Sequence, residues 1–120
     1  MSKTILVVED DIELLDLYTE ILQVNRYNVQ TAIDGEEAVT KYMQVHPDLV
    51  VMDGDLPKLD GYEAFSQIIK SDKNAKVVIV TGFPEFEPKN KISLEQGLIS
   101  AISKPIGVDT LLDLAKKYTN

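Results

Sequence analysis

Residues 49–61, LVVMDGDLPKLDG, join a short apolar run to a carboxylate and a turn rich in Gly, Pro and Asp. An apolar run of four residues, bounded by turn signals, is typical of a buried strand in a parallel sheet. Asp53 would stand at the carboxyl end of this strand, where open α/β sheets bind their ligands. Because Asp is rarely buried without a partner, the position predicts either a turn cap or a functional carboxylate.

The remaining chain alternates apolar runs with segments of helical periodicity. We expect strands at residues 5–8, 28–32, 49–53, 77–80 and within 98–103. Each is followed by a helix, and the fourth, between residues 83 and 96, is short and weakly packed. Alternation at this spacing favours parallel strands with helices on both faces. We therefore predict an α/β fold, a doubly wound five-stranded parallel sheet, formed by one domain of residues 1–120.

Composition narrows the possible functions. The chain carries 12 basic and 20 acidic residues, for a net charge of −8. This balance argues against a nucleic-acid-binding surface and against docking on an anionic membrane. There is no Cys, so disulfides and thiolate metal sites are excluded. The first apolar run is too short for a signal-peptide core or a membrane span, and by default we expect a cytoplasmic protein.

Several chemically active residues follow the predicted strands. Because the carboxyl ends of parallel strands share one edge of the sheet, these residues should lie together. They are Glu9 and Asp10 after the first strand, Asp53 after the third, Thr81 after the fourth and Lys104 after the fifth, with Asp55 two positions beyond Asp53. One strand-end acid is ordinary, whereas several carboxylates, a hydroxyl and an ammonium on one edge predict a site.

The chemistry of these groups suggests a ligand. Two unit charges about 4 Å apart cost roughly 1 kcal/mol in water and about 4 kcal/mol at an effective dielectric of 20. Some carboxylates must therefore be protonated, or a cation must bind. Oxygen ligands favour a hard cation, and Mg²⁺ fits best. Thr81 and Lys104 suit a phosphoryl group instead, and an Asp beside both can itself become an aspartyl phosphate.

Over essentially its whole length the chain resembles the receiver domain of two-component response regulators. The matching motifs are Ile5–Asp11, Met52–Pro57 with Asp60-Gly61, Val80–Gly82 and Lys104-Pro105. Each motif is weak alone, but all of them in this order and at these spacings are specific. The resemblance implies the flavodoxin-like strand order 2-1-3-4-5. It also implies a cis Lys104–Pro105 bond, which would otherwise be expected for only about 5–6% of such bonds.

The resemblance also implies a role for each site residue. Asp53 would accept a phosphoryl group from a phosphohistidine on a sensor kinase or phosphotransfer protein. Mg²⁺ would be bound by Asp10 and Asp53 directly, by the backbone carbonyl of Asp55, and by Glu9 mainly through a water. Lys104 would contact the phosphoryl oxygens, and Thr81 would move toward them. These roles agree with phosphoryl transfer, which depends mostly on positioning and charge neutralisation.

The chain departs from the receiver pattern at three places. Receivers often have Tyr or Phe where this chain has Ala101, so the usual aromatic switch cannot operate. Leu98 and Ile99 lie in an unusually apolar segment. They either form a partner or self-association surface or pack under the fourth helix. Finally, Asp55 adds a carboxylate at a position that tunes the lifetime of the phosphoryl group in this family.

Two other functions remain open. Asp53-Gly54-Asp55 after an apolar strand also resembles the first motif of haloacid-dehalogenase-like phosphatases, in which the two Asp are nucleophile and general acid. Against this, those enzymes usually have Thr or Val where this chain has Pro57. The third possibility is a receiver fold that serves as a constitutive interaction module, and Ala101 is its best support.

We interpret the chain as a stand-alone receiver, a signalling phosphoacceptor that catalyses only its own phosphorylation and dephosphorylation. Phosphorylation would change the binding of a downstream protein. The surface for that partner would comprise the fourth helix, fifth strand and fifth helix, as is usual in the family. We expect a monomer or a weak dimer.

Overall fold

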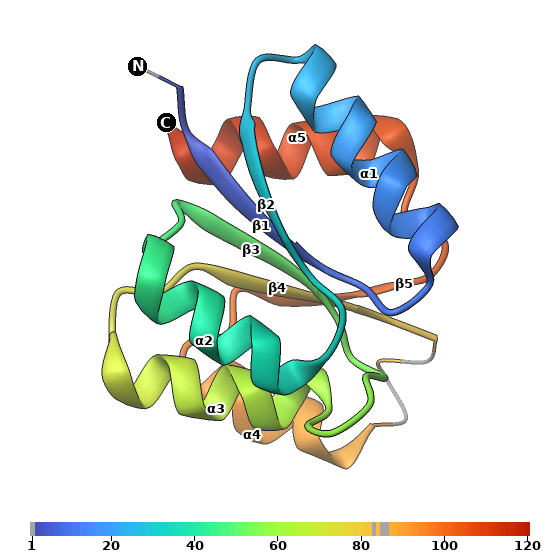
Figure 1. The fold of residues 1–120 in the computed structure, drawn as a ribbon. Coiled ribbons are helices and arrows are strands. Elements are labelled where there is room, and N and C mark those ends of the chain that lie inside the picture. Colours follow the sequence, from blue (N-terminus) through green and yellow to red (C-terminus); the bar gives the residue numbers. More distant parts are fainter. Residues whose placement is uncertain (1, 83, 85–86) are drawn as a thin grey trace.

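The computed structural model describes residues 2–82, 84 and 87–120, in which strands and helices alternate along the chain (Figure 1). The strands are β1 (Thr4–Val8), β2 (Asn28–Ala32), β3 (Leu49–Asp53), β4 (Val77–Thr81) and β5 (Ser100–Ser103). The helices are α1 (Ile12–Val24), α2 (Gly35–Val45), α3 (Gly61–Ser71), α4 (Pro88–Glu95) and α5 (Val108–Thr119). Part of the predicted loop before α4, residues 83, 85 and 86, lies outside the described residues.

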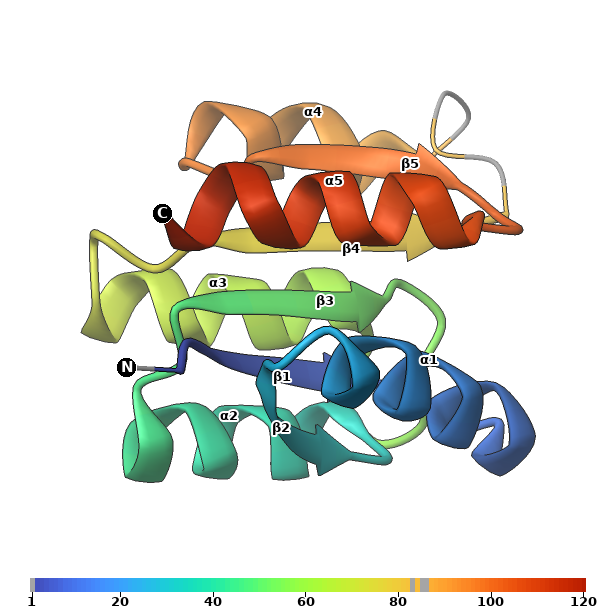
Figure 2. The same cartoon turned by 90° about the horizontal axis from the view of Figure 1, so that it is seen from above.

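The five strands form one sheet in the order β2-β1-β3-β4-β5, and all neighbouring pairs are parallel. Both the parallel doubly wound sheet and the strand order implied by the resemblance are therefore confirmed. Figure 2 shows α1 and α5 on one face and α2, α3 and α4 on the other. The carboxyl ends of β1, β3 and β4 meet at one edge, where Asp53 is in register with Val80.

Successive residues of the central strands point to opposite faces and form two apolar cores. On β1, Leu6 packs toward the face of α2 and α3, with Tyr42 and Phe65. Ile5 packs toward the face of α1 and α5, with Leu15 and other side chains. All five residues of β3 are buried, as expected for a central strand covered on both faces. This two-sided burial holds the strand that ends in Asp53.

Acidic caps begin the first three helices. The side chains of Asp11, Asp34 and Asp60 each accept a hydrogen bond from the backbone N–H three residues later. At α3 the arrangement is a full capping box, because the Glu63 side chain also accepts from the Asp60 backbone N–H. These three Asp residues therefore serve as helix N-caps. Each cap fixes the residue at which its helix begins.

Helix α4 is the least buried of the described helices. Within Pro88–Glu95 only Ser93 is buried, while Ile92 is 57% exposed and Leu94 43% exposed. Leu98, by contrast, is buried in the core beside α3, and Ile99 packs partly against the opposite core. The packing alternative therefore holds for Leu98, whereas Ile99 is half-buried on the face opposite α4 and does not pack under that helix. In the part of the chain that the structure describes, no helix has the length and apolar character needed to cross a membrane.

Candidate functional site

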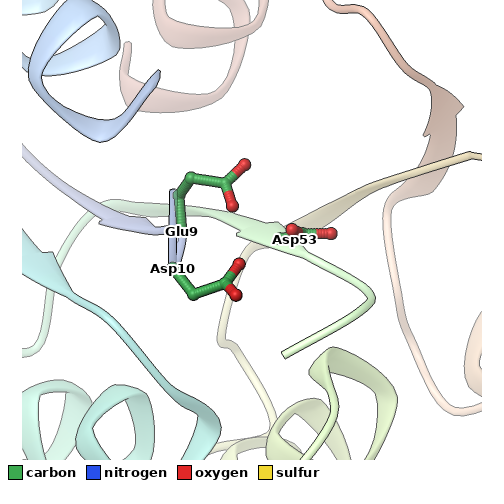
Figure 3. A group of neighbouring side chains, drawn as sticks. All are labelled: Glu9, Asp10 and Asp53. Atoms are coloured by element: carbon green, nitrogen blue, oxygen red, sulfur yellow. The ribbon is translucent and has the colours of Figure 1, made fainter. Parts of the chain in front are cut away.

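Three carboxylates meet at the edge of the sheet where β1 and β3 end. The Glu9 and Asp53 side chains are buried and Asp10 is exposed. One carboxylate oxygen from each of the three residues lies within 4.8 Å of the others. Figure 3 shows the Glu9 and Asp10 side chains directed toward Asp53. The Glu9 N–H donates to the Ala32 carbonyl at 3.1 Å, which extends the sheet pairing to the site itself.

Lys104 brings a positive charge to this cluster from the end of β5. Its Nζ donates to Oδ2 of Asp53 at 2.8 Å and to Oε1 of Glu9 at 3.4 Å. The Lys104 N–H donates to the Thr81 carbonyl at 2.8 Å, so the backbone here stays paired to β4. The following bond to Pro105 is cis, as the resemblance implies. The structure thus brings Lys104 onto the two buried carboxylates.

The second carboxylate oxygen of Asp53 also accepts a hydrogen bond. Its Oδ1 accepts from the Asp55 N–H at 3.0 Å. The Asp55 carboxylate is exposed and is not part of the group of three, within the described residues. Thr81 lines the same cleft as Asp53 and Lys104, and the volume of this cleft is about 590 Å³. Asp55 lines this cleft as well. Of the predicted site residues, Glu9, Asp10, Asp53 and Lys104 are thus brought into contact range, while Thr81 and Asp55 line the cleft beside Asp53 and Lys104.

Burial and crowding alter the ionisation of this cluster. Burial raises the pKa of the Glu9 carboxyl to about 7, and the hydrogen bond and charge of Asp53 act in the same direction. The Lys104 charge and the Asp11 N–H oppose this rise only in part. Burial by itself would lower the pKa of the Lys104 ammonium, but contacts with Asp53 and Glu9 outweigh it and raise that pKa. Lys104 therefore stays charged.

The donor set suits a hard divalent cation. Its members are all carboxylate oxygens, which are the ligands that Mg²⁺ and Ca²⁺ prefer. Lys104 supplies one positive charge against three carboxylates. Burial is the main cause of the raised pKa of Glu9, and the hydrogen bond and charge of Asp53 add to it. A cation between Asp10, Asp53 and Glu9 would remove the remaining repulsion, so the residues fit such an ion.

Sequence reasoning missed other residues of the cleft. Asp60, Tyr62 and Glu87 also line it, and none of the three was among the predicted site residues. Gly61 is needed for close approach, because a Cβ there would lie 2.3 Å from the Asp53 carbonyl oxygen. An aromatic residue directly after a predicted Asp-Gly helix start could have pointed to Tyr62.

Comparisons with known proteins agree with this geometry. The family model described as "Response regulator receiver domain" matches residues 5–116. Sporulation initiation phosphotransferase F of Bacillus subtilis is 30% identical over 118 residues, 98% of this chain and 94% of that protein. Chemotaxis protein CheY of Treponema pallidum is 38% identical over 112 residues, 91% of this chain and 77% of that protein.

A similar solved structure is the CheY-like response regulator receiver domain protein of Methanospirillum hungatei. It is 30% identical and superposes with a TM-score of 0.89, covering 98% of this chain and 93% of that one. The family match covers nearly the whole sheet and all four strand ends that form the site. The chain therefore belongs to the response regulator receiver domain family of two-component signalling proteins.

Proposed function

We propose that Asp53 accepts a phosphoryl group from a phosphohistidine of a sensor kinase or phosphotransfer protein. The observation that carries this proposal is the 2.8 Å contact of Lys104 with Asp53, whose carboxylate also belongs to a group of three with Glu9 and Asp10. Receiver domains are signalling modules that exchange phosphoryl groups with such partners, rather than classical enzymes. Residues 1–120 would act in this way as a single domain.

In the transfer, an Asp53 carboxylate oxygen attacks the phosphorus atom. A new O–P bond forms and the N–P bond to the imidazole breaks. The electron pair of that bond stays on the imidazole nitrogen, which takes a proton from solvent. Lys104 then faces the phosphoryl oxygens, and the Thr81 hydroxyl can donate to them from the cleft wall. Catalysis rests on positioning and charge stabilisation.

The carboxylate cluster would hold Mg²⁺. Asp10 and Asp53 would bind it directly, Asp55 through its backbone carbonyl, and Glu9 mainly through a water. When bound, Mg²⁺ supplies positive charge to the phosphoryl oxygens. The support is the convergence of three carboxylates within 4.8 Å, with one Lys ammonium in contact with two of them.

An intact-mass assay tests the proposal. The protein is incubated with acetyl phosphate, with and without Mg²⁺, beside Asp53→Asn and the control Asp113→Asn, which changes an exposed Asp on α5. We expect one phosphoryl adduct that needs Mg²⁺ and Asp53 and is retained in Asp113→Asn. The absence of an adduct from a folded, metal-bound protein would favour the constitutive interaction module instead.

The same samples separate a receiver from a phosphatase. A haloacid-dehalogenase-like enzyme would release inorganic phosphate continuously from an added phosphomonoester. We expect no such turnover, because the family of the chain and the exposed position of the Asp55 carboxylate favour a phosphoacceptor. Sustained release that depends on Asp55 would support the phosphatase.

The phosphorylated state would change the binding of a downstream protein at α4, β5 and α5. The exposed apolar residues on this side support the assignment: Ile92 is 57% exposed, Leu94 43% and Val108 51%. The acidic charge makes nucleic acid and anionic membranes poor partners. We expect the protein to act in the cytoplasm as a monomer or weak dimer, which sedimentation velocity can measure.

A further inference from the structure

Tyr62 lines two separate surface cavities, a cleft and a groove. It lines the cleft of Asp53 and Lys104. It also lines a separate groove of about 190 Å³ between α3 and α4, together with Lys89, Ile92 and other residues. The Tyr62 side chain is only 4% exposed, so it forms the wall between them. A movement of the Tyr62 ring would therefore change the shape of both the cleft and the groove.

The Tyr62 hydroxyl is buried without a hydrogen-bond partner among the described residues. Buried tyrosine hydroxyls usually have one, and leaving a buried donor unpaired is unfavourable. Tyr62, Asp60 and Glu87 line the same cleft, and burial, with the charges of Glu87 and Asp60, raises the pKa of Tyr62 to about 12. The Tyr62 hydroxyl therefore shares a cleft with two carboxylates but donates to neither in this conformation.

Helix α4 is held mainly by polar contacts near its start. Glu87 is its N-cap and accepts from the Lys89 N–H at 3.0 Å. The Lys89 ammonium pairs with Asp60 and Glu63 at the start of α3. Because its apolar residues are largely exposed, α4 can shift without breaking a large core. The start of α4 and the wall of the cleft share Glu87.

We propose that Tyr62 couples the Asp53 cleft to α4: when Asp53 is phosphorylated, the Tyr62 hydroxyl forms a hydrogen bond to the Glu87 carboxylate, and the start of α4 shifts with Glu87. This inference rests on the proposed function of Asp53. It adds a positioning residue, outside the predicted site, through which phosphorylation reaches α4.

Electrostatic repulsion would cause this shift of Glu87 and the start of α4. A phosphoryl group brings about 1.5 to 2 negative charges into the cleft. Glu87 lines the same cleft and is repelled, together with the helix start that it caps. A hydrogen bond from Tyr62 then stabilises the displaced carboxylate. Such a bond to a charged acceptor is worth roughly a tenfold change in the equilibrium between the two positions.

Amide hydrogen exchange of residues 88–95 tests the coupling. It is measured before and after treatment with acetyl phosphate and Mg²⁺, in the wild type, Tyr62→Phe and Tyr27→Phe. The first variant removes the hydroxyl and keeps the ring. The control removes a hydroxyl from a half-buried Tyr that packs against the other core. We expect phosphorylation to change α4 exchange in the wild type and in Tyr27→Phe, and roughly tenfold less in Tyr62→Phe.

Intact mass on the same samples separates the two proposals. If the wild type gains no phosphoryl group, the proposed function fails and the coupling fails with it. If Tyr62→Phe is phosphorylated and its α4 responds as in the wild type, only the coupling is overturned. Glu87→Gln provides a second variant should Tyr62→Phe fold poorly. Since it removes the repelled charge, its α4 response should also fall, and an unchanged response would contradict the proposal.

Discussion

Nζ of Lys104 lies 2.8 Å from Oδ2 of Asp53, although the two residues are 51 positions apart in the chain. Parallel pairing of β3, β4 and β5 carries both to the same edge of the sheet. The Lys104 side chain is about two-thirds buried, and its contacts with Asp53 and Glu9 raise the pKa of its ammonium, which keeps it charged. The Lys104 ammonium is therefore positioned to stabilise additional negative charge at Asp53.

Replacing this ammonium should slow phosphorylation. In Lys104→Met, we expect the rate of Asp53 phosphorylation by acetyl phosphate and Mg²⁺ to fall by about 10²–10³-fold, the usual cost of removing one donor to developing negative charge. The rate comes from a time course of intact mass. Lys116→Met, which changes an exposed Lys on α5, is the control. Equal phosphorylation rates in the two variants would show that Lys104 does not contribute to the phosphorylation of Asp53.

Magnesium should stabilise the folded protein. Binding at 100 times the dissociation constant adds about 2.7 kcal/mol to the free energy of unfolding, which thermal unfolding with and without EDTA can measure. Asp10→Asn removes one of the three clustered carboxylates and should reduce this gain. Asp16→Asn on the exposed side of α1 should preserve it. A gain that is the same in all three proteins would place the ion elsewhere.

Two glycines at helix starts should respond differently to Ala. In Gly61→Ala the new Cβ would lie 2.3 Å from the Asp53 carbonyl oxygen, whereas at Gly107 nothing lies within 4 Å. We expect Gly61→Ala to lower the free energy of unfolding by about 1–3 kcal/mol, the range for overpacking. Gly107→Ala should change it little. Urea denaturation compares the two, and similar losses would contradict the close approach at Gly61.

A hydrogen bond between α2 and the end of α3 should make stability depend on pH. The Tyr42 hydroxyl donates to Oδ2 of Asp72 at 2.7 Å, and this bond lowers the pKa of Asp72. Tyr42→Phe should therefore lower the free energy of unfolding at pH 7, by about 1 kcal/mol for a bond of this kind at a solvent-exposed acid.

The sign of the pH effect follows from linkage. Because the pKa of Asp72 is lower in the folded than in the unfolded state, its contribution is present above the ordinary Asp pKa of about 3.9. It is lost as pH falls through the folded value. Urea denaturation at pH 7 and pH 3 should show the difference between Tyr42→Phe and wild type narrowing in acid. A constant difference would assign the loss to packing alone.

The sequence by itself was enough to predict the fold class and the residues that follow the strands at the edge of the sheet. Runs such as 49–52 and 77–80 are apolar throughout because a central parallel strand is covered on both faces. Parallel pairing then puts the residues that follow these strands at one edge. This is why Glu9, Asp10, Asp53, Thr81 and Lys104 could be grouped before any coordinates were considered.

Only the tertiary structure determines which of these charged groups contact one another, how deeply they are buried and which residues surround them. Nothing in the local sequence shows that Glu9 is buried, or that Lys104 contacts it at 3.4 Å. Nor does it show that Tyr62 lines both the cleft and the groove beside α4, with a hydroxyl that has no hydrogen-bond partner among residues 2–82, 84 and 87–120. Burial and pKa depend on the dielectric and on charges brought together from distant segments, and those distances exist only once the sheet and its helices have packed.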